Sequence, residues 1–197
     1  MNKQILFLGY SRKETQLISR IEEKGKKVIH SSGKISWENE FDLIICFGYR
    51  HIINKEQICK SSGPIINLHV SYLPWNKGAH PNFWSHYECT PSGVTIHEID
   101  SGIDTGNIIY QRYVNFKEKE DTFALTYKRL LFEIEDLFNK NIDSILSKNW
   151  SSKPQRRIGT THKLADLPKL FKGWDSNIQD EITRLDRILS DKKDNKL

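Results

Sequence analysis

Residues 64–70 read Pro64-Ile65-Ile66-Asn67-Leu68-His69-Val70, an apolar run with two polar side chains near its end. A short apolar run of this kind is typical of a buried strand. Because successive side chains of a strand point to opposite faces, Asn67 and His69 should share one face while Leu68 takes the other. The run therefore predicts an amide and an imidazole side by side at the end of a buried strand.

A second strand and a loop bounded by glycines follow further along the chain. The strand reads Gly93-Val94-Thr95-Ile96-His97-Glu98-Ile99 and the loop reads Asp100-Ser101-Gly102-Ile103-Asp104-Thr105-Gly106. Another strand is expected over 107–110. Glycine allows the chain to turn sharply on either side of Asp104, so we expect this carboxylate to fold back toward His69.

Further strands expected at residues 5–8, 26–30 and 42–48 complete a sheet. The stretch at 42–48 is continuously apolar after Asp42, as in a parallel strand that is covered on both faces. Apolar residues at helical spacing occupy 15–25, between the first two runs. This alternation of strands with helices or loops predicts an α/β fold, a single doubly wound, Rossmann-like domain with a mostly parallel sheet.

The chain has 197 residues, which suits one well-buried domain. We expect the main domain over residues 1–150, with its longest helix at 121–146, and a short C-terminal extension over 151–197. The extension should contain a turn or short strand at 159–162 and a last helix at 178–189. Its apolar residues predict that it folds back on the domain or joins a second chain. We favour a homodimer.

Composition indicates an ordinary globular protein, with 37% hydrophobic and 28% charged residues. No apolar run approaches membrane-spanning length, and the N-terminus shows no signal-peptide pattern. The three cysteines lack C-x-x-C spacing and indicate reduced thiols. The net charge of +5 lies largely at helix ends and in the tail, so it favours an anionic substrate over nucleic acid. We expect a cytoplasmic protein that binds neither membranes nor nucleic acid.

Several side chains could be drawn together as metal ligands. The two groups are His80 with His86 and Cys89, and His97 with Asp100 and Asp104. Neither group has the compact ligand spacing of a zinc motif. We therefore expect no metal.

Linked motifs in the first two thirds of the chain resemble those of the folate-dependent formyltransferases. They are Asn67-Leu68-His69 with Ser71-Tyr72-Leu73-Pro74, Gly93-Val94-Thr95-Ile96-His97, and Asp104-Thr105-Gly106-Asn107-Ile108-Ile109. Two more resemble the sugar-nucleotide N-formyltransferase branch: Trp75-Asn76-Lys77-Gly78-Ala79 and Pro81-Asn82-Phe83-Trp84-Ser85. The match covers residues 41–110 and implies the formyltransferase fold.

The resemblance implies that Asn67, His69 and Asp104 are catalytic. Formyl transfer to an amine develops an oxyanion, so the site needs a donor to that oxygen and an acceptor for the amine proton. Asn67 can donate to the oxyanion, and His69 can donate to it or take the proton. Asp104 can orient His69 and hold the incoming ammonium, and His97 would support these residues from behind. Taken singly, Asn67 could instead cap a loop and His69 could be a satisfied polar residue.

The resemblance also implies N10-formyltetrahydrofolate as cosubstrate. Its pterin would lie in the loop that leaves the strand at 42–48, where open α/β sheets bind their ligands. Tyr49, His51 and Ile53 match this loop, and Asp100 joins them as a candidate cofactor-binding residue. The alternative is a plain surface loop.

The acceptor implied is a dTDP-linked amino sugar, dTDP-4-amino-4,6-dideoxyglucose, made for O-antigen or another surface polysaccharide. Trp75 and Lys77, on the exposed limb of their loop, are candidates for a nucleobase platform and a phosphate contact. Tyr10 and Arg12 of the first turn are further substrate-binding candidates.

Two other activities stay open within the resemblance. Phosphoribosylglycinamide formyltransferases grip a phosphate with a Gly-rich first turn, from which Gly9-Tyr10-Ser11-Arg12 departs. A formyltetrahydrofolate hydrolase would share much of the site and transfer the formyl group to water. The loop around Trp75 favours a bulky acceptor over water.

Overall fold

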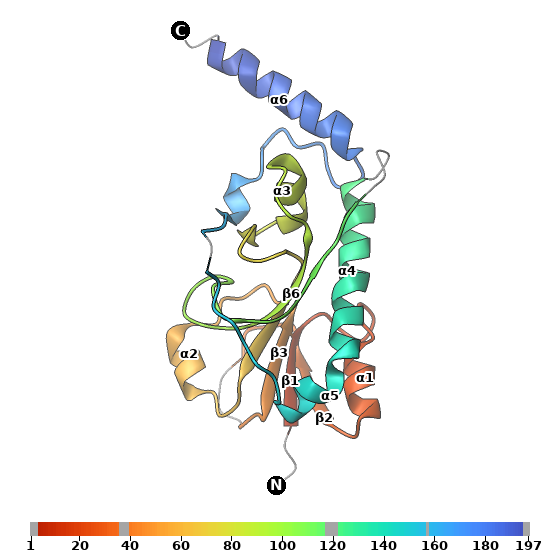
Figure 1. Cartoon of the computed structure of the whole chain (residues 1–197), viewed down its shortest axis with the longest axis vertical. Coiled ribbons are helices and arrows are strands. Elements are labelled where there is room, and N and C mark those ends of the chain that lie inside the picture. The colour runs from red at the N-terminus through yellow and green to blue at the C-terminus, as the bar shows by residue number, and fades with distance from the viewer. Residues whose placement is uncertain (1–3, 36–39, 117–121, 157, 195–197) are drawn as a thin grey trace.

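The computed structural model of the chain describes residues 4–35, 40–116, 122–156 and 158–194. Within these ranges the chain forms a six-stranded sheet in the order β2-β1-β3-β4-β6-β7 (Figure 1). The strands are β1 (Gln4–Gly9), β2 (Lys27–Ser31), β3 (Leu43–Phe47), β4 (Ile65–His69), β6 (Gly93–Glu98) and β7 (Ile108–Tyr113). Strands β1 to β4 are parallel, whereas β6 and β7 are antiparallel to their neighbours. The predicted mostly parallel α/β sheet is confirmed.

Helices cover both faces of the sheet, as in a doubly wound fold. Helices α1 (Leu17–Glu23), α4 (Phe123–Lys140) and α5 (Ile142–Ser147) pack on one face, and α2 (Lys55–Lys60) packs on the other. Alternation along β1 supplies both cores: Ile5 and Phe7 face α1 and α4, while Leu6 and Leu8 face the α2 side. Each such fully buried side chain contributes about 1.5–3 kcal/mol.

Strand β4 carries Asn67 and His69 on the face that α2 covers. The register pairs Asn67 with Cys46 of β3 and with His97 of β6, and Cys46 belongs to the apolar cluster on the α2 side. Leu68 points the other way, into the cluster with α1 and α4. Laterally paired residues share a face of the sheet, so the alternation read from the sequence places both polar side chains on one side.

The long helix expected over 121–146 is two helices. Thr122 caps α4 by accepting a hydrogen bond from the backbone N–H of Leu125 at 3.2 Å, and Asp121 lies outside the described residues. Helix α4 ends at Lys140, and α5 begins at Ile142. Asn141 separates them, and its side chain donates to the Leu137 carbonyl at 2.8 Å. Asparagine competes in this way for backbone hydrogen bonds and so favours a helix end. The apolar spacing continues across Asn141, so it does not reveal that the helix is interrupted there.

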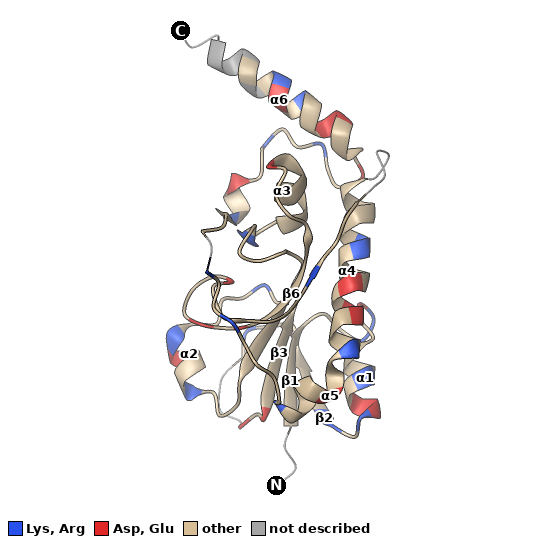
Figure 2. Ribbon diagram, viewed as in Figure 1, with Lys and Arg blue, Asp and Glu red and all other residues tan. Residues whose placement is uncertain are grey.

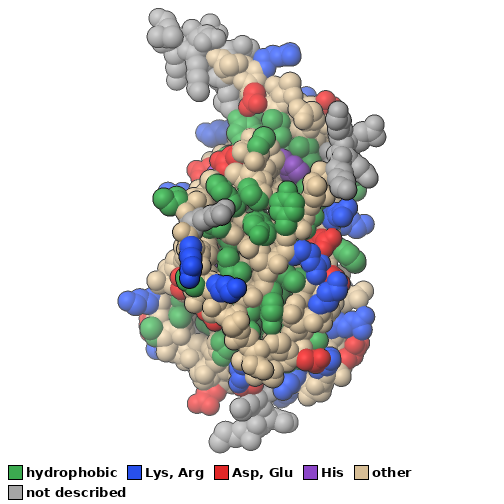
Figure 3. All heavy atoms as spheres, in the orientation of Figure 1, with side chains coloured by type: hydrophobic (Ala, Val, Ile, Leu, Met, Phe, Trp, Pro, Cys, Tyr) green, Lys and Arg blue, Asp and Glu red, His purple; other side chains and the backbone are tan. Residues whose placement is uncertain are grey.

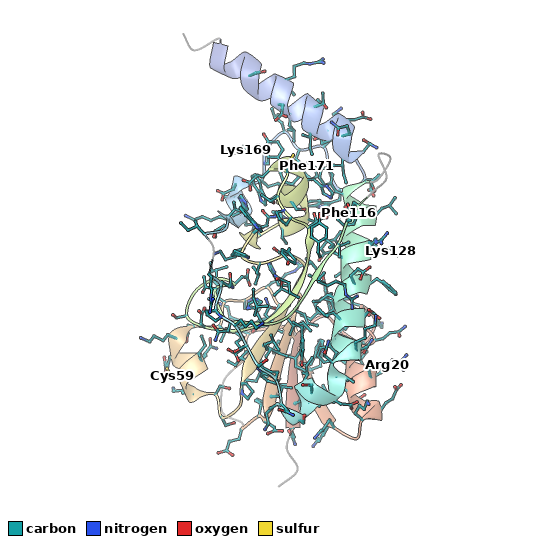
Figure 4. The ribbon with its side chains drawn as sticks, viewed as in Figure 1. Arg20, Cys59, Phe116, Lys128, Lys169 and Phe171 are labelled. Carbon is teal, nitrogen blue, oxygen red and sulfur yellow. The ribbon has the colours of Figure 1, made fainter. Side chains whose placement is uncertain are left out.

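The C-terminal extension folds back on the domain. Strand β8 (Thr161–His162) pairs with β5 (Lys77–Gly78) in a two-stranded sheet, ahead of a 3-10 turn at Leu164–Asp166. Phe171 then packs against Phe83 of α3 (Pro81–Tyr87), with ring centroids 5.1 Å apart (Figure 4).

The last helix, α6 (Ile178–Asp194), is longer than the predicted 178–189. It begins beside α3 and α4, where Leu185 is buried in a cluster with Phe83 and Phe123, and then points away from the sheet (Figure 1). None of the described helices is long and apolar enough to cross a bilayer.

Charged side chains of both signs are spread over the helices (Figure 2). On the face shown in Figure 3, basic side chains are interspersed with acidic and apolar ones. Among the ion pairs of the described residues, Arg112 lies 2.7 Å from carboxylate oxygens of both Glu133 and Asp136. Interspersed charge of this kind suits a solvated surface.

Candidate active site

Asn67, His69 and Asp104 meet on the α2 face of the sheet, at the carboxyl end of β4. Asn67 Nδ2 donates to Asp104 Oδ1 at 3.2 Å, and His69 Nε2 lies 3.6 Å from Asp104 Oδ2. The side chains of His69 and Asp104 are only 10% and 13% exposed. The Asp104 loop folds back onto the polar end of the strand, in the arrangement that its flanking glycines predict.

His97 completes the polar cluster from the neighbouring strand β6. Its Nδ1 lies 2.8 Å from the Glu98 carbonyl, which only accepts hydrogen bonds, so Nδ1 carries a proton. Nε2 then faces Asn67 Nδ2 at 3.2 Å and Asp104 Oδ1 at 3.4 Å. His97 is 1% exposed and supports the other three side chains from inside the protein.

The amide of Asn67 is already engaged in this cluster. Its NH2 group faces both His97 Nε2 and Asp104 Oδ1, each at 3.2 Å. Both distances lie at the long end of the range for hydrogen bonds from nitrogen. The sequence predicts that this amide can donate to an oxyanion. In the structure, one of its N–H groups would first have to break its contact with His97 or Asp104.

The loop that carries Asp104 is held from two other segments. The Gly78 N–H donates to Asp104 Oδ2 at 2.8 Å, and Gln155 Nε2 donates to the carbonyls of Asp104 and Gly106 at 2.8 and 2.9 Å. Asp104 has a φ of +52°, in the left-handed region that side chains with a Cβ rarely adopt. Uncommon backbone conformations of this kind persist only where surrounding contacts hold them.

The electrostatics of the cluster give Asp104 and His69 different protonation states. Burial raises the pKa of the Asp104 carboxyl, but His69, His97 and the Gly78 N–H together outweigh burial and hold that pKa below its usual range. Burial lowers the pKa of His69 below 6.5, against the opposing field of Asp104. At neutral pH the site therefore pairs a carboxylate with a neutral imidazole.

We expect the His69 imidazole to titrate below pH 6.5, because burial disfavours its charged form. Long-range ¹H–¹⁵N NMR of the seven histidines measures this directly, with His69→Asn used to assign the signal. Just below pH 6.5 the unfolded chain binds more protons at this residue than the folded one. The contribution of His69 to the free energy of unfolding therefore decreases as pH falls through that window. A folded-state pKa above that of an exposed histidine would contradict this prediction.

The predicted pterin loop leaves β3 on the same face as Asn67, His69 and Asp104, which are called the triad below. Tyr49 and Ile53 pack against the apolar cluster on the α2 side, and the rings of Tyr49 and His51 lie edge to face at 5.3 Å. Ile52, which lies between His51 and Ile53 in the sequence, is 80% exposed. The loop thus presents apolar surface next to the strand that carries the triad.

Asp100 shapes the loop of Asp104. Its Oδ1 accepts hydrogen bonds from the Gly102 N–H at 2.9 Å and from Thr105 Oγ1 at 2.5 Å. The side chain is exposed, and these described contacts lie within its own loop.

Trp75 and Lys77 do not lie on an exposed limb, which corrects the prediction. Both are half-buried, and Lys77 lies in β5, where it pairs with Thr161 of the C-terminal extension. A strand of two residues is too short to show any periodicity, so the sequence does not reveal that the extension covers this loop.

The two predicted substrate-binding residues of the first turn, Tyr10 and Arg12, contact different helices. The Tyr10 hydroxyl lies 2.8 Å from that of Tyr127 in α4. Arg12 pairs with Glu22 of α1 at 2.5 and 2.7 Å. Helix α1 covers the face opposite the triad, so the structure does not bring Arg12 together with Asn67, His69 and Asp104.

Sequence reasoning missed a second set of residues around His69. His69 Nε2 lies 3.3 Å from the Asn76 carbonyl. The Asn76 N–H donates to Thr160 Oγ1 at 2.8 Å, and that hydroxyl donates back to Asn76 Oδ1 at 2.9 Å. Asn76 has a φ of +55°, which asparagine tolerates better than most residues, but no local signal links it to Thr160.

No group of three or more His, Cys, Asp or Glu side chains in the described part of the chain is placed to hold a metal ion. The largely buried cluster of Asn67, His69, His97 and Asp104 forms hydrogen bonds among its own side chains and with backbone groups.

Residues 15–141 match the family model described as formyl transferase. The chain is 31% identical over 105 residues to dTDP-4-amino-4,6-dideoxyglucose formyltransferase of Mycobacterium tuberculosis, covering 53% of this chain and 44% of that protein. It is 34% identical over 138 residues to methionyl-tRNA formyltransferase of Fusobacterium nucleatum, covering 70% and 43%. The chain thus spans less than half the length of these curated relatives.

Solved structures show the same fold. The formyltransferase PseJ from Anoxybacillus kamchatkensis, in complex with UDP-4,6-dideoxy-4-formamido-L-AltNAc and tetrahydrofolate, is 43% identical with a TM-score of 0.83, covering 89% of this chain and 96% of that one. An N-formyltransferase from Helicobacter canadensis, in complex with folinic acid and dTDP-3-aminofucose, has a TM-score of 0.73 at 23% identity, covering 91% and 80%. The family model covers more than half of the sequence, and PseJ aligns along almost its whole length. The chain therefore belongs to the formyl transferase family.

Proposed function

We propose that this chain is a folate-dependent sugar N-formyltransferase. It would transfer the formyl group of N10-formyltetrahydrofolate to the amine of a nucleotide-linked amino sugar. The observation that carries the proposal is the buried cluster in which Asp104 lies 3.2 Å from Asn67 and 3.6 Å from His69. The similarity to PseJ, which was solved with a formamido sugar nucleotide and tetrahydrofolate, supports the class of substrate.

Asp104 and His69 divide the handling of the amine proton. A sugar amine is largely protonated at neutral pH, and Asp104 remains ionised there because its pKa is held low. The carboxylate pairs with the ammonium. The neutral imidazole of His69 accepts one of its protons at Nδ1, since Nε2 faces the Asn76 carbonyl and carries the proton of the neutral ring. The amine nitrogen then bonds to the formyl carbon while the bond from that carbon to N10 breaks. His69 returns the proton to the leaving nitrogen, and the second proton that the amine loses passes to water, so that the product is a neutral formamide.

Asn67 serves the oxygen of the formyl group. One of its N–H groups faces Asp104 Oδ1 at 3.2 Å before the substrate arrives. Pairing of Asp104 with the ammonium weakens this contact, which frees the N–H for the developing oxyanion. Catalytic hydrogen bonds are often long in the free enzyme and shorten in the complex.

Ile53→Asp should weaken folate binding by at least tenfold and leave the affinity for the sugar nucleotide nearly unchanged. Tyr49, His51 and Ile53 would hold the pterin, and a carboxylate in an apolar slot must be desolvated when the ring enters. Calorimetric titration with tetrahydrofolate and with the sugar nucleotide measures both affinities. Leu125→Asp is the matched control, because Leu125 is 56% exposed on α4, across the sheet from this loop. Equal loss of both affinities would show that the loop is structural.

The finer part of the proposal concerns which nucleotide and which amino sugar make up the acceptor. The family resemblance implies dTDP-4-amino-4,6-dideoxyglucose, which appears in the name of the M. tuberculosis relative. PseJ carries a UDP-linked 4-formamido sugar and aligns over 96% of its length. We expect a UDP-linked 4-amino-4,6-dideoxy sugar to be formylated faster than the dTDP-linked one, because the similarity to PseJ is higher and more extensive.

One experiment tests the activity and its acceptor together. The protein is incubated with N10-formyltetrahydrofolate and a panel of UDP- and dTDP-linked 3-amino and 4-amino sugars, and mass spectrometry records the gain of one formyl group. Phosphoribosylglycinamide in the same panel tests the purine-pathway alternative. Formate release without any amine would indicate a hydrolase instead.

We also propose that the protein works in the cytoplasm as a homodimer, in the synthesis of a surface polysaccharide. Leu164, Leu170 and Trp174 of the extension are 73%, 45% and 40% exposed. Apolar side chains gathered on one segment are typical of a contact surface. A monomer mass by light scattering would contradict the dimer.

A further inference from the structure

The segment that follows α5 crosses the molecule as a strap, defined as residues 152–156 and 158–162 (Figure 1). At one end the backbones of Lys153 and Ile108 exchange two hydrogen bonds of 2.8 and 2.9 Å. At the other end Thr161 pairs with Lys77. Near the middle, a Cβ added to Gly159 would lie 1.7 Å from the Pro74 carbonyl oxygen, so the strap fits closely against the loop that follows β4.

Gln155 is the residue of the strap that contacts the Asp104 loop. Its Nε2 donates to the carbonyls of Asp104 and Gly106, at 2.8 and 2.9 Å. Because both partners are carbonyls, the NH2 end of the amide must face the loop. The other end, Oε1, is buried and has no hydrogen-bond partner in the described part of the chain. A buried unpaired acceptor is unfavourable. The favourable contribution of this side chain therefore comes from its two hydrogen bonds to the loop carbonyls.

We propose that Gln155 is a positioning residue for formyl transfer, which holds the backbone of Asp104 so that the carboxylate stays beside His69 and Asn67. This inference depends on the proposed role of Asp104. Within the loop Asp100 holds Gly102 and Thr105. Glycines at 102 and 106 nevertheless flank a left-handed Asp104, whose carbonyl is held from outside the loop by Gln155.

The arrival of the amine explains why a backbone anchor is needed. The carboxylate oxygens of Asp104 are held by Asn67 and by the Gly78 N–H. The incoming ammonium competes with these donors for the same oxygens. Gln155 binds the main chain instead, where the substrate does not compete, and therefore keeps Asp104 in place throughout the reaction.

Gln155→Met tests the proposal, because methionine has a similar length but no hydrogen-bond donor. We expect kcat to fall by about ten- to a hundredfold, as for a catalytic group displaced by about 1 Å. The KM values for folate and sugar nucleotide should change less than kcat does. Ser152→Ala is the matched control: it removes the 3.4 Å contact of the strap with Asn107 and leaves Asp104 untouched, so its kcat should be unchanged.

The Asp104→Asn background shows whether Gln155 acts through Asp104. If it does, adding Gln155→Met to Asp104→Asn should lower the rate little further, since residues that act as a unit are not additive. Amide hydrogen exchange at 102–106 should also become faster in Gln155→Met, while exchange in β6 stays as in the wild type. Gln155→Leu, which removes the donor without adding a charge, should show the same pattern and replaces Gln155→Met if that variant melts early.

Three results would overturn the inference. One is a normal kcat in both Gln155 variants, and another is an equal loss of rate with and without Asp104→Asn. A loss confined to KM would mean that the strap only binds substrate. Near-normal transfer by Asp104→Asn alone is a different failure, because it would refute the proposed chemistry itself.

Discussion

Asp104→Asn should lower formyl transfer at neutral pH by about a hundred- to ten-thousandfold, the range for loss of a group that handles a proton. Asparagine keeps the shape of the side chain but cannot pair with an ammonium as a carboxylate does. The amine then has to reach the site already neutral, so the rate should partly recover as pH rises toward the pKa of the amine itself. Single-turnover formylation from neutral to alkaline pH measures both effects.

The control for this variant is Asp143→Asn, which changes an exposed carboxylate on α5 that pairs with Lys24. Its pH profile should match that of the wild type. If Asp104→Asn kept near-normal transfer at neutral pH, Asp104 would only order its loop, and the proton would need another acceptor.

Asn67→Ala should slow transfer by about a hundred- to thousandfold at every pH, the cost of losing one oxyanion donor. The amide does not titrate, so the shape of the pH profile should be retained while its height falls. Rapid-quench measurements at saturating concentrations of both substrates report this effect on the chemical step. Asn139→Ala, at an exposed position of α4, is the control.

The pH profile of Asn67→Ala also separates two tasks of this residue. Asn67 donates to Asp104 Oδ1 in the free protein, so its removal could act by displacing the carboxylate. A rate that recovers at alkaline pH, as expected for Asp104→Asn, would mean that holding Asp104 is the main task. A uniform loss supports direct contact with the oxyanion.

Local patterns predict the sheet and the meeting of Asn67, His69 and Asp104 at the end of β4. Alternation along residues 65–69 places Asn67 and His69 on one face, and the glycines at 102 and 106 allow Asp104 to turn back. The same local reasoning failed at Asn141. There the apolar spacing continues through Ile142 and Ile145 although the helix stops.

Contacts between distant segments could not be read from the sequence. Gln155 and Asp104 are 51 positions apart, and Thr160 and Asn76 are 84 apart. The strands that bring the extension over Lys77 have two residues each, too few for a pattern. Arg12 of the first turn is a predicted substrate contact, but in the structure it pairs with Glu22 on the next helix.

Because the strap lies late in the chain, the sheet can fold during synthesis before Gln155 is available to hold Asp104. Both apolar clusters that flank the sheet draw their described members from residues up to Trp150. A nascent chain can therefore bury these clusters while Gln155 is still inside the ribosome, since domains begin to fold as they emerge, at about 5–20 residues per second. The backbone of Asp104 gains its contact with Gln155 only after the strap has emerged. Translation that stops shortly after Trp150 would release a chain with its sheet formed but without this backbone anchor for Asp104.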